Sequence, residues 1–291
     1  MSGIMDVGNK LAINYTGSRD YIVTEELKNV VNISIALQKP LLIKGEPGTG
    51  KTMLASSLAE ALGKELIIWS IKSTTTAQNG LYVYDTVQRL YDSQFGEGDI
   101  ANIRQYIKLG MLGMALSSEE QPVLLIDEID KADLEFPNDL LWELDRMQFF
   151  IPETRETITA KTRPIVIITS NAEKELPDAF LRRCIFHYIA FPDAEQMARI
   201  VYAHYPKIDN TLLQRAMDKF YELRAVDDIQ KKPSTSELLD WLTALSLSGI
   251  TLENTDKKDF PFLGVLLKKN EDVDTLVEFH EKGPKAVYKR R

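Results

Sequence analysis

The chain is poor in cysteine and histidine. Its 291 residues contain one cysteine and three histidines. A single thiol excludes an internal disulfide, and we expect Cys184 to pack as a small buried residue rather than to act as a nucleophile. The histidines at 187, 204 and 280 lie too far apart along the chain to show the spacing of metal ligands.

Long apolar runs and excess positive charge are also missing. No stretch approaches the ~20 apolar residues that span a bilayer, and Met1–Lys10 lacks the apolar core of a secretory signal. We therefore expect no membrane span and a reducing, cytoplasmic location. The net charge of -8 argues against a dedicated nucleic-acid-binding protein, since nucleic-acid-binding domains usually present a basic face. The basic tail Lys285–Arg291 is expected to be a solvated terminus.

One motif carries specific chemistry. Residues 45–52 read Gly-Glu-Pro-Gly-Thr-Gly-Lys-Thr, after the apolar run Leu41–Ile43 and before a predicted helix from Met53 to Leu62. This is the phosphate-binding loop pattern in the strand–turn–helix setting that it needs. Backbone N–H groups of such a loop converge on phosphate oxygens, and the helix N-terminus adds positive charge. The predicted ligand is ATP with Mg²⁺, contacted by Gly45, Glu46, Pro47, Gly48, Thr49, Gly50, Lys51, Thr52 and Met53.

A second buried-strand run, Val123–Ile126, ends in an Asp-Glu pair. We expect Asp127, together with the Thr52 hydroxyl, to ligate Mg²⁺, and Glu128 to orient and polarise an attacking water. An acidic pair after a strand can also simply cap the next helix. Its position after a phosphate-binding loop favours the catalytic interpretation.

Two later features complete the pattern. The apolar run Ile165–Ile168 leads to Asn171, whose amide would reach the same water or the γ-phosphate if the strands lie side by side. A short helix beginning near Leu176 then ends in the pair Arg182 and Arg183. An arginine pair is usually a solvated surface. The four features in this order and spacing have no shared structural explanation.

On these residues the sequence resembles the AAA+ ATPases over about residues 20 to 250. Gly45–Thr52 is similar to Walker A, Leu124–Glu128 to Walker B, and Asn171 to sensor 1. Arg183 is similar to the arginine finger that completes a neighbouring subunit's site, with Arg182 as the alternative. The resemblance implies an ATP hydrolase with an αβα core containing a parallel sheet and a small all-helical lid. Its implied catalytic residues are Lys51, Glu128, Asn171, Arg182 and Arg183.

Two details resemble the MoxR branch of that family. Alternating residues around a polar turn predict a hairpin at about 149–160, and an insert is expected at about 73–95. MoxR-like proteins are implied to be oligomeric ATPases that remodel, assemble or mature a partner protein, and we expect this chain to form a homo-oligomer, a hexameric ring. That partner is often a protein with a von Willebrand factor A domain. Two alternatives stay open: a DNA-directed AAA+ motor or loader, and an ATP-binding switch with little turnover.

The predicted organisation has three parts. Residues 1–23 form an N-terminal segment, residues 24–192 the nucleotide-binding core, and residues 193–291 the helical lid and tail. Apolar runs alternating with helical segments predict a parallel sheet with helices on both faces. The segment after the second strand run is predicted to contain one helix from Asn138 to Met147.

The lid departs from the family pattern. No arginine follows Pro233, where many AAA+ proteins carry the sensor 2 arginine. Ser234 with Glu237 is predicted to form a capping box for the helix that follows. Three cations, at Lys231, Lys232 and Arg224, remain candidates to replace that arginine.

The insert carries exposed or buried aromatics, and the pattern does not decide which. Tyr91 and Phe95 would either grip a polypeptide in a channel or pack the insert against its own domain, and we favour packing. We also predict that Met111, Met114 and Trp142 lie in the core.

Overall fold

The computed structural model describes residues 14–18, 21–96, 99–171, 173–253 and 259–282. The described chain forms two compact units. The first contains the described residues up to Glu46 and from Gly50 to Ala190, and the second contains Pro47–Thr49 and the described residues from Phe191 onward. Each unit has its own apolar core, and each is described separately below.

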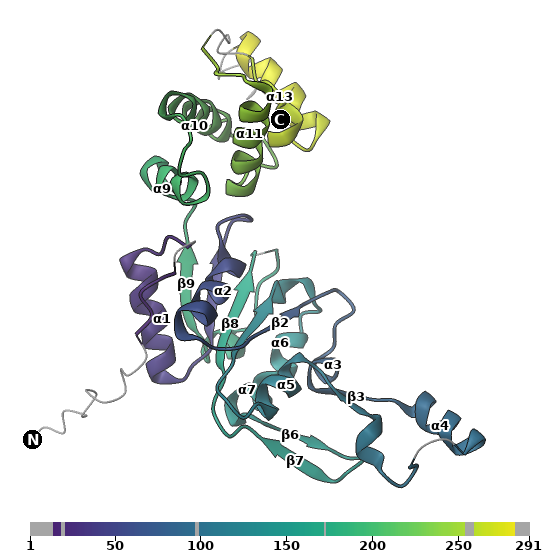
Figure 1. Cartoon of the computed structure of the whole chain (residues 1–291). Helices are drawn as coiled ribbons and strands as arrows, with labels where there is room; N and C mark the ends of the chain where they lie inside the picture. The colour runs from purple at the N-terminus through teal and green to yellow at the C-terminus, as the bar shows by residue number, and fades with distance from the viewer. Residues whose placement is uncertain (1–13, 19–20, 97–98, 172, 254–258, 283–291) are drawn as a thin grey trace, which may run out of the picture. The chain divides into compact units, whose positions relative to one another are not determined.

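A five-stranded parallel sheet forms the centre of the first unit (Figure 1). The strand order is β2-β5-β8-β1-β9, and each pair is parallel. The strands are β1 (Leu41–Gly45), β2 (Leu66–Ser70), β5 (Val123–Asp127), β8 (Ile165–Ser170) and β9 (Ile185–Ile189). This confirms the predicted αβα fold class, because alternate side chains of the central strands enter apolar clusters on both faces.

The two faces are covered by different helices. On one face, α1 (Glu25–Leu37) and α2 (Lys51–Leu62) pack on residues such as Leu41 and Ile43. On the other face, Leu42 and its neighbours pack against α5 (Met111–Ser117) and the short elements after β5. Those short elements are η2 (Ile129–Lys131), α6 (Phe136–Asp139), α7 (Leu141–Arg146) and α8 (Asp178–Leu181).

The single helix predicted from Asn138 to Met147 is wrong. The segment forms α6 and α7, which are separated at Leu140. Pro137 lies in the first turn of α6, where its missing N–H is tolerated, and α7 ends at Met147 in a left-handed conformation with φ 53°.

Two antiparallel ribbons extend the first unit. The expected hairpin is formed by β6 (Gln148–Ile151) and β7 (Glu156–Thr159). The insert is longer than the predicted 73–95, because β3 (Tyr82–Tyr84) pairs with β4 (Ile107–Leu109). Between these strands lie α4 (Thr86–Phe95) and η1 (Ile103–Tyr106), and α3 (Ala77–Leu81) precedes them.

The predicted core positions of three large side chains are also wrong. Met111, Met114 and Trp142 are 41%, 41% and 50% exposed. The packing favoured for Tyr91 and Phe95 is wrong as well, because both side chains are exposed, although Tyr82 of the same insert is buried. An apolar residue on a helix is therefore a weak guide to burial here.

The second unit is helical around its own core. Its helices are α9 (Ala194–His204), α10 (Asn210–Arg224), α11 (Thr235–Ser248), α12 (Leu263–Leu266) and α13 (Asn270–Lys282). Fully buried Trp241 and Phe220 are central to it. The predicted capping box is confirmed: Glu237 accepts from the Ser234 N–H at 2.7 Å, and the Ser234 side chain accepts the reciprocal bond. In the part of the chain that is described, no helix combines the length and apolarity needed to cross a bilayer. The basic tail Lys285–Arg291 lies outside the described residues.

Candidate nucleotide-binding site

The phosphate-binding loop joins β1 to the N-terminus of α2. Gly48 and Gly50 have φ of 76° and 84°, a left-handed conformation that favours glycine. A Cβ on Gly50 would lie 3.1 Å from the Tyr21 ring, so this tyrosine lies beside the loop. Met53, in the first turn of α2, is 44% exposed. The loop therefore presents backbone N–H groups and a helix N-terminus, the arrangement that suits a phosphate.

Lys51 is folded back onto the loop. Its Nζ donates to the carbonyl oxygens of Gly45 and Glu46, both at 2.8 Å, and the residue is only 7% exposed. Burial lowers the pKa of the Lys51 ammonium, although the carboxylates of Asp127 and Asp130 oppose that shift. A buried cation whose hydrogen bonds go to two carbonyl oxygens is well placed to exchange them for phosphate oxygens.

The carboxyl ends of β5 and β8 bring the acidic residues to the same edge of the sheet. Ile126 of β5 pairs with Ile168 of β8, and Lys44 of β1 pairs with Ser170. The three strands therefore end side by side, and the segments that follow them meet there. This register explains how residues about forty positions apart come into contact.

The Asp127 carboxylate accepts hydrogen bonds from two hydroxyl groups. Its Oδ1 accepts from Thr52 Oγ1 at 3.0 Å and from Thr169 Oγ1 at 2.6 Å. A carboxylate facing a hydroxyl fits Mg²⁺, which takes few protein ligands and completes its shell with water and phosphate oxygens. The two predicted metal ligands, Thr52 and Asp127, are thus in direct contact.

Glu128 makes hydrogen bonds through its backbone N–H and through both oxygens of its carboxylate. Its backbone has φ 59° and ψ 50°, uncommon for a residue with a side chain, and its N–H donates to Thr169 Oγ1 at 2.8 Å. Its Oε1 accepts from Asn171 Nδ2 at 3.1 Å, and its Oε2 pairs with Lys131 Nζ. This hydrogen bond raises the pKa of Lys131.

Sequence reasoning missed three residues of this network, namely Thr169, Lys131 and Asp130. Asp130 is 2% exposed, and its Oδ2 accepts from the backbone N–H groups of Asn171 at 3.1 Å and Glu173 at 2.9 Å. It fixes the segment that carries the candidate sensor. The only sequence signal was a third acidic residue shortly after the strand, which by itself indicates no role.

The two candidate finger arginines lie elsewhere. Arg183 Nε donates to Asp145 Oδ2 at 2.6 Å, and its Nη1 donates to the Ala179 carbonyl at 2.8 Å. It precedes β9, whose first residue pairs with Leu41 at the start of β1, whereas the loop follows Gly45 at the other end. At ~3.3 Å per residue, those strand ends are about 13 Å apart. Arg182 and Arg183 are therefore not brought to the nucleotide site of their own chain.

Two of the three cations considered as lid substitutes, Arg224 and Lys231, have partners within the second unit. Arg224 Cζ lies 3.3 Å from the centroid of the Phe191 ring, and its Nη1 donates to the Pro233 carbonyl at 2.5 Å. Lys231 Nζ lies 3.7 Å from Glu237 Oε1. These contacts order the backbone directly before the capping box.

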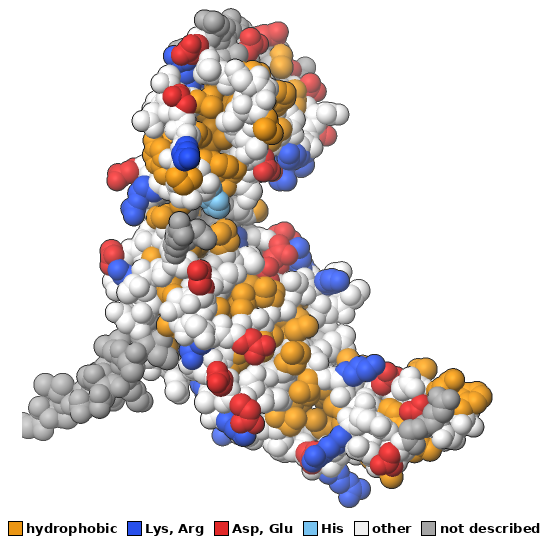
Figure 2. Space-filling view, in the orientation of Figure 1, with side chains coloured by type: hydrophobic (Ala, Val, Ile, Leu, Met, Phe, Trp, Pro, Cys, Tyr) orange, Lys and Arg blue, Asp and Glu red, His pale blue; other side chains and the backbone are white. Residues whose placement is uncertain are grey.

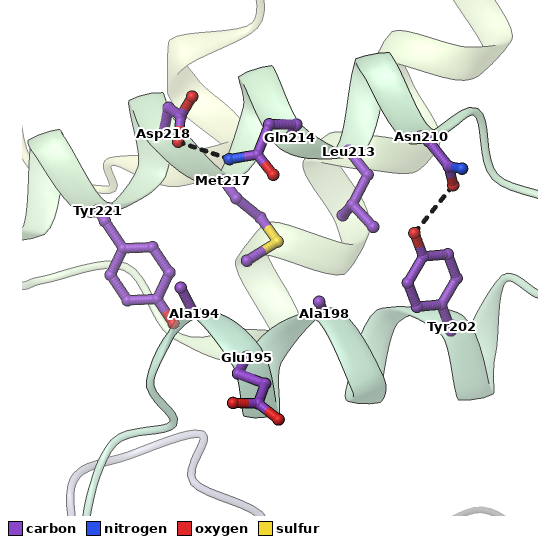
Figure 3. A pocket seen from close by; sticks show the side chains of 10 residues that line it. All are labelled: Ala194, Glu195, Ala198, Tyr202, Asn210, Leu213, Gln214, Met217, Asp218 and Tyr221. Carbon is purple, nitrogen blue, oxygen red and sulfur yellow. Dashed lines mark hydrogen bonds between the residues drawn. The ribbon is translucent and has the colours of Figure 1, made fainter.

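A separate groove lies between α9 and α10 (Figure 3). Leu213 and Met217 form its buried floor, while Glu195 and Asp218 stand at its rim, and the cavity volume is about 700 Å³. Acidic side chains repel phosphate, and no basic side chain lines the groove. It is therefore not a second candidate for the nucleotide.

This chain is similar to one known domain family and to several known proteins. Residues 40–184 match the AAA domain of the dynein-related subfamily. A mitochondrial Lon protease homolog of Dictyostelium discoideum is 31% identical over 156 residues, covering 50% of this chain and 14% of that protein. Midasin of Giardia intestinalis is 26% identical over 210 residues, covering 68% of this chain and 4% of that protein.

The chain thus spans only a small part of these relatives. Among solved structures, the FIGL-1 AAA domain in complex with ADP aligns with a TM-score of 0.41 and 21% identity, over 81% of this chain and 70% of that one. The family match covers the phosphate-binding loop, the acidic pair and the candidate sensor described above. The chain therefore contains an AAA domain of the AAA+ ATPase family, which spans residues 40–184.

Proposed function

We propose that the chain binds ATP with Mg²⁺ and hydrolyses it to ADP and phosphate. The observation that carries the proposal is the meeting of Thr52, Asp127, Glu128 and Asn171 at one edge of the sheet. Asp127 is 3.0 Å from the Thr52 hydroxyl, and Glu128 is 3.1 Å from the Asn171 amide. These are the groups that phosphoryl transfer to water needs: cation ligands, a water-orienting carboxylate and a polar neighbour.

The binding step uses the loop and its lysine. Lys51 would leave the carbonyls of Gly45 and Glu46 for the β- and γ-phosphate oxygens, where the α2 N-terminus adds favourable charge. When bound to Thr52 and Asp127, Mg²⁺ would neutralise phosphate charge. The loop contacts assigned to Gly45–Met53 belong to this proposal.

The chemical step is assigned to Glu128. Its carboxylate would orient a water in line with the γ-phosphate and accept a proton from it as the bond from the water oxygen to phosphorus forms and the bond from phosphorus to the ADP oxygen breaks. Asn171 holds Oε1 and Thr169 holds the backbone N–H, so the carboxylate is fixed before the substrate arrives. Such preorganisation lowers the barrier because little reorganisation is left for the reaction itself.

Arg183 is assigned to the site of an adjacent copy. It is exposed, and it lies at the end of the sheet opposite to its own loop. A guanidinium supplied in trans would stabilise charge on the transferring phosphoryl group, with Arg182 as the alternative. This requires a homo-oligomer, for which we propose a hexameric ring.

The biological role that we propose is remodelling, assembly or maturation of a partner protein in the cytoplasm. What supports it is the pair of ribbons that extend the nucleotide-binding core, the β6–β7 hairpin and the longer β3–β4 insert. Their places in the chain resemble those of the MoxR branch. A partner with a von Willebrand factor A domain is part of this proposal.

The first experiment separates binding from turnover. Lys51→Ala should lose nucleotide binding in calorimetry, because the phosphates lose their fixed counter-charge. Glu128→Gln keeps the Thr52–Asp127 pair and should bind ATP while losing turnover. Tight ATP binding by Lys51→Ala, or near-normal turnover by Glu128→Gln, would refute these assignments.

The second experiment tests the trans arginine by mixing. Arg183→Ala subunits have an intact loop and Lys51→Ala subunits have an intact finger, so each pure assembly should be inactive. Mixed assemblies regain complete sites wherever the two kinds adjoin in the correct order, and activity should return. Co-assembled mixtures that stay inactive at every ratio would contradict the role of Arg183, and the same experiment would then be run on Arg182.

A further inference from the structure

Helix α4 of the insert is amphipathic, but its apolar side chains face solvent and its charged side chains face the protein. Four apolar side chains at helical spacing face outward: Val87 is 78% exposed, Leu90 59%, Tyr91 48% and Phe95 63%. We call these four residues the α4 stripe. In Figure 2 hydrophobic side chains gather over this helix at the lower right.

The charged residues of α4 contact the rest of the insert instead. Asp92 is 8% exposed and accepts from Tyr106 Oη and from Gln88 Nε2, both at 2.8 Å. Arg89 donates to Tyr84 Oη at 2.5 Å. The helix is thus anchored by hydrogen bonds of its charged residues while its apolar side chains remain in water, the opposite of an ordinary surface helix.

Both ends of the helix are fixed as well. Asp85 caps the N-terminus by accepting from the Gln88 N–H at 2.9 Å, and it pairs with Lys108 of β4 at 2.8 Å. Gly96 closes the C-terminus in a left-handed conformation. The stripe is therefore presented by an ordered helix. The rings of Tyr91 and Phe95 lie against each other, with centroids 4.6 Å apart.

The size of the stripe makes it unusual. Two aromatic rings that are about half exposed leave roughly 200 Å² of apolar surface in water, before the two aliphatic side chains are added. That is a large share of the few hundred Å² that a monomer's biggest apolar patch usually reaches.

The charge pattern of α4 indicates what kind of molecule covers the α4 stripe. Both charged residues within α4, Arg89 and Asp92, bind tyrosines of the insert, so the exposed side chains of the helix are all uncharged. The exposed side of α4 offers phosphates no Lys or Arg, and the neighbouring cations Lys108 and Arg104 are each already paired with a carboxylate, which disfavours a nucleic acid and an anionic lipid surface. An uncharged apolar stripe fits a protein segment with an apolar stripe of its own.

The area of the α4 stripe further restricts which kind of molecule can bind there. A stable dimer interface needs about 800 Å² per partner, more than one ten-residue helix supplies, so the stripe alone would not hold two copies together. We propose that the α4 stripe binds a short amphipathic helix of a partner polypeptide, with apolar anchors at spacings of three and four and no charged residue among them. This rests on the proposed function only in that the partner is the protein to be remodelled.

The test uses a defined probe. A fluorescein-labelled 14-residue peptide of Ala, Gln and Ser carries Leu at positions 3, 6, 7 and 10. A second peptide has the same composition with its four leucines scattered around the helix. Fluorescence anisotropy without nucleotide should show binding of the striped peptide and at least about tenfold weaker binding of the scattered one.

The variant Leu90→Gln/Phe95→Gln removes half of the stripe and keeps good helix formers on exposed positions. It should weaken binding of the striped peptide at least about tenfold, with unchanged circular dichroism and unchanged basal ATP turnover. The matched control is Leu247→Gln on α11, a leucine that is 86% exposed, which should bind as the unaltered chain does.

Four results would overturn the proposal. They are equal binding of both peptides, unchanged binding by the double variant, loss of self-association in sedimentation by the double variant without any peptide binding, and variant-sensitive binding to phosphatidylcholine–phosphatidylglycerol vesicles in place of the peptide. Because binding is measured without nucleotide, a chain that binds the peptide but hydrolyses no ATP would uphold the stripe and refute the proposed ATPase.

Discussion

Replacing Thr169 by valine should damage the site more than its conservative size suggests. The Thr169 hydroxyl accepts from the Glu128 N–H at 2.8 Å and donates to Asp127 Oδ1 at 2.6 Å, and the residue is fully buried. Valine has nearly the same shape but offers neither an acceptor nor a donor. The substitution therefore removes two hydrogen bonds while leaving the packing volume unchanged.

The expected loss follows from those two bonds. An N–H left without its partner costs about 1–3 kcal/mol, and a hydrogen bond to a charged group contributes about 1.5–3 kcal/mol. Asp127 keeps its bond from Thr52, and the added methyl group gains some burial, so we expect a net loss of about 2–4 kcal/mol. For a unit of this size that lowers Tm by about 5–15 °C.

Scanning calorimetry measures this shift, and two controls identify its cause. Thr169→Ser keeps the hydroxyl and should lose much less stability. Thr157→Val makes the same chemical change on the exposed face of β7 and should shift Tm by about 2 °C at most. A Thr169→Val protein that melts within about 1 °C of the unaltered chain, or a serine variant as unstable as the valine one, would refute the reasoning.

Three further predictions concern single side chains. Partial burial raises the pKa of Cys184 to about 12, so at pH near 8 iodoacetamide should alkylate it about 10³-fold more slowly in the folded chain than in urea, as mass spectrometry would show; equal rates would contradict the raised pKa. Lys51 has a lowered pKa, so its ammonium should lose its proton at a lower pH than an ordinary lysine, and ADP affinity should fall as pH rises toward that pKa. Lys51→Arg should bind ADP more weakly but with less pH dependence, and a parallel pH dependence in the two proteins would exclude Lys51 as the titrating group. Lys131→Met frees one oxygen of Glu128 and should raise turnover by a few-fold at most, the size expected of an exposed ion pair, with unchanged ADP affinity; a fall in turnover would show that Lys131 assists the reaction.

The sequence was sufficient for the parts of the fold that rest on local pattern. Apolar runs such as Val123–Ile126 are buried strands because both of their faces are covered, and short continuous runs of this kind are typical of a parallel sheet. The placement of Asp127 and Asn171 at one edge also followed, since parallel strands end together. Their contacts with Thr52 and Glu128 are the direct consequence.

The sequence was not sufficient where a residue's partner lies far along the chain. Nothing local shows that Thr169 bridges Asp127 and Glu128, because the pairs are 42 and 41 residues apart. The left-handed conformation of Glu128 is likewise set by its surroundings, since an isolated glutamate avoids it.

Burial failed as a prediction for a different reason. Hydrophobic residues fill the core, but much of a protein's surface is apolar too, so an apolar side chain does not by itself indicate burial. Trp142 and Met114 illustrate this on ordinary helices. On α4 the buried Asp92–Tyr106 hydrogen bond decides which side of the helix faces inward, and neither residue alone indicates that bond.

The phosphate-binding loop and Arg183 lie at opposite ends of the sheet, and this restricts how copies of the chain can assemble. The loop and acidic residues follow the carboxyl ends of β1 and β5, whereas Arg183 precedes the amino end of β9. A trans arginine therefore joins two unlike surfaces, and an interface between unlike surfaces is heterologous. Such contacts either close into a ring or continue as a filament, and they cannot complete both sites of a two-fold dimer unless each copy reaches around the other. A two-fold dimer with full ATP turnover, in which the copies do not reach around each other, would thus contradict the assignment of Arg183, independently of any substitution.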